Sequence, residues 1–487
     1  MAAAISDAGV HGAPGVYAPH RSHAGTKLSW PLNLLLLYIA GITIFGKGPT
    51  YIGFEPVFWG EVVLGLSLLW AFRRWHRVVI RTSQARALTL LILCFITVGA
   101  IETVVDYPEG RLNSLRDAAV WYYAFFYFVG LVIASNGEQF RIFTSRWKLF
   151  WLLAVPWGIA ELLSGNWLSQ HSPTLPGSRG VLLLSNSGSE LAQNIGLGCL
   201  LLVSGNWRGG LLTRTSPRVL LALLGLAAVA LYPGRGSKVS VIVAFLVFFA
   251  VSLSQSSSGR AHRRRLSVMV LVVAAAIASA LAGGLDITSR LGLDRFSEVA
   301  PGQIEGTAEW RLEWWRGLYN AVMDRNPLFG LGFGDGLIGY NPYIVGNDSS
   351  PVLNARSPHN FNITIFARMG IVGSLLWGGI LLVGLFIPLW SALTASTALE
   401  RAESGYRAFW IAAIFAAWVD SSFGVLMEGP VMAIPFWLIL GMLSMRPNLN
   451  SQIVAQRSVE HFRVTKNRHR QPQVNPAPHL TSNADPA

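Results

Sequence analysis

Long apolar runs separated by short polar segments dominate this chain. Each run is close to the roughly 20 residues that an α-helix needs to cross the hydrocarbon core of a bilayer. Backbone polar groups in lipid must be satisfied internally, so the pattern predicts an all-α, polytopic membrane protein. The predicted spans are 29–46, 53–72, 87–105, 119–135, 149–165, 190–206, 219–233, 239–255, 267–284, 360–392, 408–424 and 430–445, about twelve in all.

One interruption of the apolar pattern is long, 285–359, and it has a helical pattern of its own. Residues 308–325 predict a helix that ends at Asn326-Pro327, because proline disfavours helix in the residue before it. Its apolar stripe consists of Trp310, Trp314 and Leu318. The glycines at 330, 332, 334 and 336 then predict a tightly turning strip. The segment that follows the loop either crosses the membrane or enters it only partway before Gly370.

The apolar pattern divides the chain into three parts. Residues 1–28 form a polar N-terminal segment, 29–445 form one transmembrane domain, and 446–487 form a polar tail that we expect to be disordered. No small-residue cleavage site follows the first span, so we expect that span to be retained.

Composition agrees with a membrane protein. Of the 487 residues, 52% are hydrophobic and 13% are charged, whereas soluble domains carry about 25% charged residues. The net charge of +13 resides largely in short loops, which argues against a nucleic-acid partner. Cys94 and Cys199 both fall inside apolar spans, so they indicate neither a disulfide framework nor a metal site.

Basic residues in alternate loops predict the orientation. The loops in question contain Arg73, Arg74, Arg77, Arg81 and Arg86; Arg141, Arg146 and Lys148; Arg208, Arg214 and Arg218; and Arg260, Arg263, Arg264 and Arg265. Cytoplasmic loops carry the excess of lysine and arginine, so both termini are expected in the cytoplasm. The loops 106–118, 166–189, 234–238 and 285–359 are then expected on the outer face.

Basic residues on the outer face are not required for orientation, so they are candidates for binding an anion. Arg235 and Lys238 lie in the tight turn YPGRGSK, and Arg311 and Arg316 lie in the predicted helix. Arginine holds phosphate through forked, charge-assisted hydrogen bonds. The competing interpretations are snorkelling to lipid headgroups for the turn, and pairing with nearby glutamates on the helix surface for Arg316.

Two further arginines and one histidine complete the set of candidates. Arg116 shares its loop with several acids, which could neutralise it locally, and Arg356 comes shortly before His359. His359 lies between Pro358 and Asn360, where the long loop returns to the membrane. An imidazole can accept a proton near neutral pH, so His359 is a candidate general base; the alternative is an ordinary surface histidine. No metal-binding, nucleotide-binding or nucleophile-elbow motif appears, so we expect no metal and no cofactor.

Three of these motifs together resemble the bacterial O-antigen ligase and polysaccharide polymerase family of membrane glycosyltransferases. They are GRGSKVSVIVAF, RLEWWRGL followed by NPLFGLGFGD, and PHNFNITIFARMGIVGS; EGPVMAIPFWLILGM also resembles the family's final spans. His359 and Gly370 meet the family pattern of a histidine, ten residues and a glycine.

The resemblance implies a GT-C-like helical fold and transfer of a glycan from a polyprenyl-diphosphate carrier to an acceptor hydroxyl at the outer face. By the same resemblance, Arg235 and Arg311 would hold the diphosphate, and His359 would deprotonate the acceptor. Lys238, Arg316, Arg116 and Arg356 are then candidate substrate-binding residues, and other polysaccharide assembly proteins are candidate partners. The acceptor is a glycan or a lipid, so the sequence leaves polymerase and ligase open.

Two other classes of function remain open from the sequence. A transporter or flippase for lipid-linked glycans would explain the spans and the anion-binding arginines equally well. It does not explain why a candidate base and the basic residues gather on one face. The other class is a non-catalytic component of an assembly complex.

Overall fold

The computed structural model describes residues 28–54, 57–175, 181–184, 188–204, 215–232, 234–255, 309–334, 336–340 and 357–445. Within these ranges the chain is mostly helical, with one small antiparallel hairpin of β1 (Gly53–Phe54) and β2 (Val57–Phe58). The predicted span 267–284, much of the predicted loop 285–359 and the predicted tail 446–487 lie outside the described residues.

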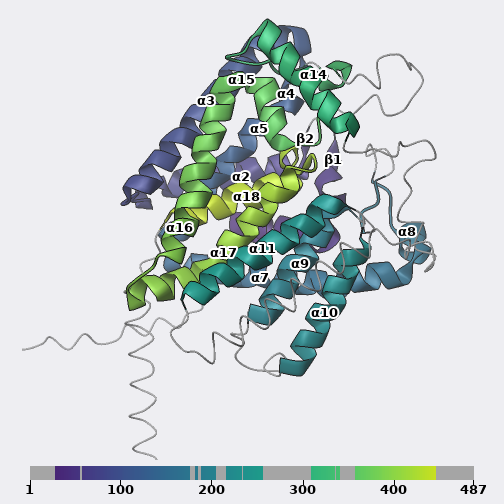
Figure 1. The fold of residues 1–487 in the computed structure, drawn as a ribbon, viewed down its shortest axis with the longest axis vertical. Coiled ribbons are helices and arrows are strands. Elements are labelled where there is room, and N and C mark those ends of the chain that lie inside the picture. Colours follow the sequence, from purple (N-terminus) through teal and green to yellow (C-terminus); the bar gives the residue numbers. More distant parts are fainter. Residues whose placement is uncertain are drawn as a thin grey trace, which may run out of the picture.

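The helices follow the apolar runs of the sequence (Figure 1). The α-helices are α1 (Trp30–Phe45), α2 (Trp59–Arg74), α3 (Ser83–Gly110), α4 (Leu112–Asp117), α5 (Ala119–Tyr122), α6 (Phe126–Ser135), α7 (Gly137–Ser164), α8 (Asn166–His171), α9 (Ser189–Ser204), α10 (Thr215–Leu231), α11 (Arg235–Ser254), α14 (Glu309–Arg325), α15 (Phe361–Leu381), α16 (Ile387–Leu393), α17 (Ala398–Ser421) and α18 (Pro430–Ser444). Shorter turns of helix are η1 (Gly48–Tyr51), η2 (Trp75–Arg77), η3 (Tyr123–Phe125), η6 (Leu337–Tyr340), η8 (Leu382–Phe386) and η9 (Leu426–Glu428).

Several of these helices have the length and composition of membrane spans. Four are long and apolar enough to cross a bilayer: Ser83–Gly110, Leu112–Ser135, Gly236–Ser254 and Phe361–Leu393. Three shorter apolar helices cover Trp30–Phe45, Ser216–Leu231 and Pro430–Ser444. The described residues therefore form an all-α membrane protein, as the sequence predicted.

Two boundaries predicted from the sequence are wrong. The predicted span 53–72 begins as the β1–β2 hairpin, and its helix starts only at Trp59. Glu61 fixes that start because its carboxylate accepts a hydrogen bond from the backbone amide of Phe58, at 2.9 Å. The predicted loop 106–118 is largely helical, since α3 continues to Gly110 and α4 follows directly.

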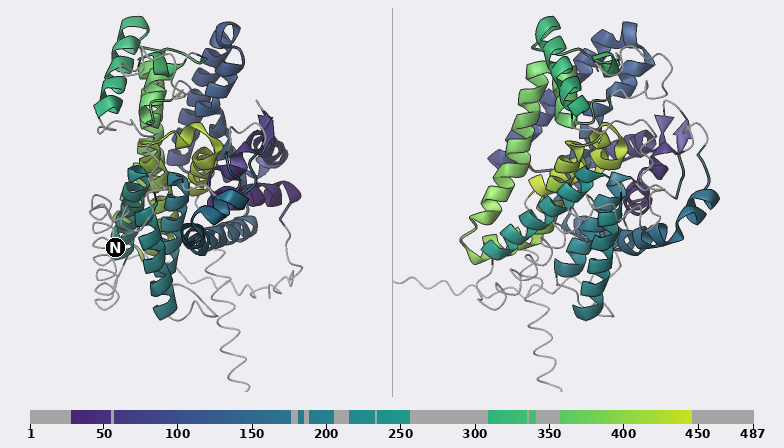
Figure 2. Two further views of the ribbon diagram at one scale, coloured as in Figure 1. Left: turned by 90° about the vertical axis from the view of Figure 1, so that its right-hand side faces the viewer. Right: turned by 45° about the vertical axis from the view of Figure 1, so that its right-hand side comes forward.

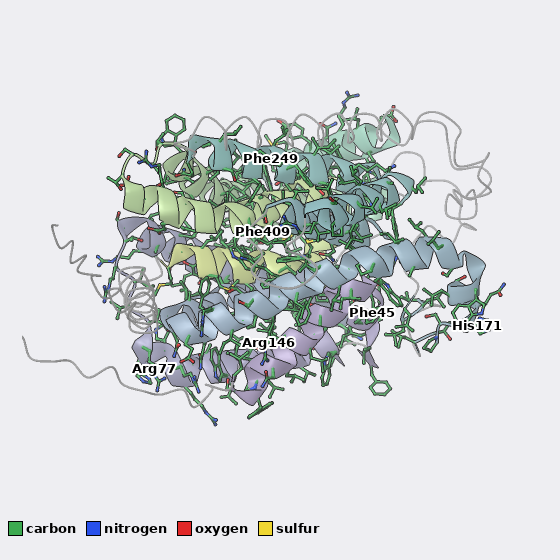
Figure 3. The ribbon with its side chains drawn as sticks, turned by 90° about the horizontal axis from the view of Figure 1, so that it is seen from below. Phe45, Arg77, Arg146, His171, Phe249 and Phe409 are labelled. Atoms are coloured by element: carbon green, nitrogen blue, oxygen red, sulfur yellow. The ribbon has the colours of Figure 1, made fainter. Side chains whose placement is uncertain are left out.

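The bundle core is built from helices that pack closely in pairs. α11 lies along α17, α6 lies along α18, and α9 lies between α7 and α10. Figure 3 shows Phe249 of α11 and Phe409 of α17 in this core, and it places Arg77 and His171 at opposite sides of the view. α6 and α18 approach each other so closely at Gly130 that a Cβ atom there would lie only 2.4 Å from the carbonyl oxygen of Leu438. Glycine, which has no Cβ atom, allows this backbone contact. Close approach through glycine is typical of helix packing in membranes.

The helix α15 reverses its direction at Gly370. Gly370 has φ +58° and ψ −152°, a backbone conformation that is almost confined to glycine. Beyond this corner the chain folds back, so that the ring of Trp377 lies 5.1 Å from that of Phe361. The short limb from Phe361 to Met369 therefore enters the bundle only partway, and the long limb begins after the corner. The sequence had left this possibility open.

Backbone hydrogen bonds join the corner at Gly370 to the turn that follows α14. The amides of Ile371 and Val372 donate to the carbonyl oxygens of Pro327 and Leu328, at 2.9 and 3.1 Å. In return, the amides of Leu331 and Gly332 donate to the carbonyl oxygens of Ala367 and Arg368, at 2.7 and 3.1 Å. The turn after α14 thus supplies hydrogen bonds that the helix loses at its break, and it fixes α14 against α15, as Figure 2 shows at the top of the fold.

The glycine strip is held from its other side by α3 and α4. The carboxylate of Asp106 accepts a hydrogen bond from the amide of Phe333 at 2.7 Å, and that of Asp117 accepts one from the amide of Gly334 at 3.0 Å. The hydroxyl of Ser114 donates to the carbonyl oxygen of Phe333 at 3.1 Å. Arg368 of α15 completes the contact by donating to the carbonyl oxygen of Gly332 at 2.9 Å. The strip is therefore a structural joint between four helices.

Candidate active site

His359 lies just before the N-terminal end of the short limb of α15. Asn360 caps this limb, because its side-chain oxygen accepts hydrogen bonds from the amides of Asn362 and Ile363, at 3.0 and 3.3 Å. His359 itself has φ +57°, which is uncommon for a residue with a side chain. The carbonyl oxygen of the preceding Pro358 accepts a hydrogen bond from the indole of Trp315, at 2.8 Å. The turn that presents the imidazole is thus fixed on both sides.

The imidazole of His359 is held in its neutral form. Its ring meets that of Trp314 edge to face, with 6.5 Å between the centroids. Partial burial, and secondarily the positive charge of Arg311, lower the pKa of His359 to about 4. The ring is therefore unprotonated at pH 7 and able to accept a proton. This is the charge state that a general base requires.

Arg311 approaches the same region from α14. Its guanidinium donates a hydrogen bond to the carbonyl oxygen of Phe423, 3.3 Å away. Partial burial lowers the pKa of Arg311, but an arginine remains charged at any ordinary pH. Arg311, Trp314 and Trp315 follow the spacing of one helix face, so the side of α14 that carries the arginine also faces His359.

The turn of α11 reaches the same end of α17. Gly236 packs so closely there that a Cβ atom would lie 2.5 Å from the Cβ of Phe423 and 3.2 Å from a carboxylate oxygen of Asp420. Arg235 is the first residue of α11, and its side chain lies outside the part of the structure that is described. Lys238 follows one turn later and is partly buried. The start of α11 and the guanidinium of Arg311 therefore both contact Phe423.

The remaining candidate residues have different surroundings. Arg316 is exposed on α14, and five residues at 100° each rotate it about 140° away from Arg311. Arg116 is exposed near the end of α4, in the segment that holds the glycine strip. Arg356 lies outside the described residues. The structure thus brings together His359, Arg311 and the backbone of the Arg235 turn.

Sequence reasoning missed an amide that joins the short limb to α17. The side-chain nitrogen of Asn362 donates to the hydroxyl of Ser422 at 3.0 Å, and its oxygen accepts from the indole of Trp377 at 2.8 Å. A polar residue three positions after His359, at the start of an apolar run, was a signal for such a contact. Through Asn362, the short limb of α15 is fixed relative to the end of α17, next to Phe423.

A buried charge pair lies beneath the glycine strip. A guanidinium nitrogen of Arg368 and a carboxylate oxygen of Asp117 are 2.9 Å apart, and both side chains are almost fully buried. Arg368 was not a sequence candidate, although an arginine within an apolar run indicates an internal partner. Within the described ranges, no group of three histidine, cysteine, aspartate or glutamate side chains is arranged to hold a metal ion.

The geometry defines a helical membrane protein in which Arg311 acts electrostatically on the candidate base, His359. A sequence model of the Wzy_C family, described as O-antigen ligase, matches residues 219–378. That range contains the GRGSK turn, α14 and the His359–Gly370 limb. The match over residues 219–378 confirms the resemblance seen in the sequence. The comparison with curated proteins finds no match. The family implies a glycosyltransferase-like enzyme that acts on a lipid-linked glycan in a membrane.

Proposed function

We propose that the protein polymerises or ligates lipid-diphosphate-linked glycans, such as O-antigen or exopolysaccharide, at the outer face of the bacterial cytoplasmic membrane. The observation that carries this proposal is the neutral imidazole of His359 beside the guanidinium of Arg311, within a domain of the O-antigen ligase family. A base and a cation at one site match the two demands of glycosyl transfer from a diphosphate.

The reaction joins an acceptor oxygen to the anomeric carbon of the donor sugar. As that bond forms, the bond between the anomeric carbon and the diphosphate oxygen breaks, and its electron pair leaves with the lipid diphosphate. His359 takes the proton of the acceptor hydroxyl, a step typically worth 10²–10⁴-fold in rate. The low pKa of His359 keeps the ring available for this step.

The negative charge that grows on the leaving diphosphate needs a positively charged partner. We assign this role to Arg311 and Arg235, because cations fixed in advance at the leaving group stabilise the transition state. Lys238, Arg316, Arg116 and Arg356 would attract and orient the rest of the anionic donor. In this proposal the arginines take the place of a metal ion, so the transfer is metal-independent.

The proposal places the reaction within a GT-C-like bundle of about twelve transmembrane helices, with both termini in the cytoplasm. The polyprenyl part of the donor would lie in the bilayer, and the glycan in the periplasm or outside the cell. The acceptor would be either another glycan or a lipid. Other polysaccharide assembly proteins would act as partners that deliver or remove the glycan.

A one-compartment assay separates this function from transport. Purified protein in detergent would be incubated with a polyprenyl-diphosphate-linked repeat, an acceptor and a metal chelator. The proposal predicts a new glycoside and free polyprenyl diphosphate; a ladder of lengthening chains would indicate a polymerase, and a single transfer a ligase. Failure to form any glycoside, together with movement of the lipid-linked repeat across liposomes, would identify a flippase instead.

A further inference from the structure

Glu428 is a carboxyl side chain that the reaction above does not use. It lies in η9, between α17 and α18, and is partly buried. One of its oxygens accepts hydrogen bonds from the hydroxyl of Ser357 and from that of Thr364, the latter at 2.7 Å. Both hydroxyl residues are almost fully buried. Glu428 thus holds the chain at two points, Ser357 and Thr364, near the N-terminal end of the short limb.

The two points enclose His359. Ser357 precedes the histidine by two residues, and Thr364 belongs to the first turns of α15 that follow it. The hydroxyls of Ser357 and Thr364 are 3.4 Å apart, so the carboxylate closes a loop of the chain around the histidine. A change at Glu428 would therefore be transmitted to the turn without any direct contact with substrate.

The turn needs such a constraint because its conformation is strained. A residue with a side chain keeps a positive φ only where its surroundings determine it from several sides. At His359 those sides are the indole of Trp315, which binds the carbonyl oxygen of Pro358, the capping amide of Asn360, and the carboxylate of Glu428. Glu428 is the ionisable member of this set.

We propose that Glu428 is a positioning residue for glycosyl transfer, because its carboxylate binds Ser357 and Thr364 and so fixes the turn that directs the His359 imidazole. This inference rests on the proposed function, since it assumes that His359 is the general base. It adds a carboxyl that orients the His359 imidazole through Ser357 and Thr364 and does not itself touch substrate.

The ionisation of Glu428 gives the proposal a pH dependence. Removal of the carboxyl from water raises the pKa of Glu428 to about 7; the hydroxyls of Ser357 and Thr364 and the charge of Arg368 partly oppose this rise. Above that pH the carboxylate can accept both hydroxyl hydrogen bonds. Below it, the neutral carboxyl is a weaker acceptor, so both hydroxyl contacts are weakened. The positioning is therefore strongest above pH 7 and weakens as the pH falls through that value.

The charged groups around Glu428 can be assigned to the elements that pack against it. Arg368 of α15 and Asp117 of α4 act on it electrostatically, with opposite signs. α18 has no ionisable side chain. In α5, Tyr122 donates its hydroxyl to Glu61, and near the end of α17, Asp420 lies within hydrogen-bonding distance of Gln193. Arg368 and Asp117 also form an ion pair with each other.

Three variants of the purified full chain test the proposal by kcat, KM and the pH profile of kcat. Glu428→Gln keeps an oxygen acceptor but cannot titrate. We expect it to stay within about tenfold of the unaltered protein at pH 8 and to lose the decline near pH 7, falling only towards the pKa of His359 near 4. Glu428→Ala should lower kcat at least tenfold with little change in the KM of the donor. Glu403→Ala, at the other end of α17, is the matched control and should change neither quantity.

The outcomes separate this inference from the proposed function. If Glu428→Ala does not fold, Ser357→Ala combined with Thr364→Val removes the same hydrogen bonds while the carboxyl stays, and it should reduce kcat in the same way. A Glu428→Gln profile that still declines near pH 7, or a Glu428→Ala variant with full kcat, would overturn the positioning role. Full transfer by His359→Ala would overturn the base assignment itself. An inactive His359→Ala beside a fully active Glu428→Ala would overturn the inference alone.

Discussion

The indole of Trp377 donates a hydrogen bond to the side-chain oxygen of Asn362, 2.8 Å away, although fifteen residues separate the two within α15. In a straight helix, with a rise of 1.5 Å per residue, they would be about 22 Å apart. Because the helix reverses at Gly370, the two residues come side by side. The reversal also brings the N-terminal end of the short limb into contact with the end of α17 and with η9. The histidine–glycine spacing of the sequence is thus the length of one helical limb.

Replacement of Gly370 tests the reversal. A Cβ atom there would lie 2.5 Å from the carbonyl carbon and oxygen of Leu328, in a backbone conformation that costs a side-chain-bearing residue about 1–3 kcal/mol. Gly370→Ala should lower the thermal unfolding temperature in detergent and reduce transfer. Gly378→Ala is the matched control on the long limb, because a Cβ atom there would meet nothing within 4 Å. Equal stability of the two variants would contradict the described corner.

The buried pair of Arg368 and Asp117 should show strong coupling in unfolding experiments. Removal of one partner of a buried ion pair leaves an uncompensated charge and typically costs about 3–5 kcal/mol. We expect Arg368→Met and Asp117→Asn each to destabilise the protein, and the double variant to lose clearly less than the sum of the two. Thermal unfolding of all four proteins completes the cycle. Strict additivity would show that the pair contributes no coupling.

Arg311 should matter for the reaction more than for the fold. In the proposed function its guanidinium holds the diphosphate, and loss of a group that stabilises the transition state costs roughly 10²–10³-fold in rate. Arg311→Gln should therefore abolish most transfer while its unfolding temperature stays near that of the unaltered protein. Arg325→Gln removes the same charge from the last turn of α14 and serves as the control. A similar loss of rate in both variants would indicate a general effect of charge.

The contact between Trp315 and Pro358 should influence the rate through the histidine turn. Trp315→Phe keeps the aromatic ring but removes the indole N–H that binds the carbonyl oxygen of Pro358. One hydrogen bond contributes about 0.5–1.5 kcal/mol to the constraint, so kcat should fall several-fold with a nearly unchanged donor KM. Tyr319→Phe, one turn further along the same helix and with an exposed side chain, should have no such effect. An increased donor KM with full kcat would assign Trp315 to binding instead.

Local signals in the sequence predicted the helix of the long loop and its end. Helix α14 runs from Glu309 to Arg325 and stops at the predicted Asn326-Pro327 step, with Trp314 and Leu318 buried along the predicted stripe. These features depend on neighbours within a few residues. The apolar runs likewise predicted the positions of most helices, because burial in lipid dictates their composition.

The reversal of α15 at Gly370 and the backbone hydrogen bonds that hold it could not be predicted from the sequence. The hydrogen bonds from Ile371 and Val372 end on residues more than forty positions earlier, and no periodicity records such a partner. Glu428 was overlooked for a similar reason: a single acid between two apolar spans looks like an ordinary loop residue until Ser357 and Thr364 are placed beside it. The role of Asp106 and Asp117 in holding the glycine strip is equally a tertiary feature.

The most direct test of the account is a single-turnover transfer assay of His359→Ala, with binding of the lipid-diphosphate donor measured in the same preparation. If the imidazole is the general base, transfer falls at least 10²-fold, donor binding stays unchanged, and added free imidazole restores part of the rate. Transfer within a few-fold of the unaltered protein, with the donor still bound, would contradict the central claim.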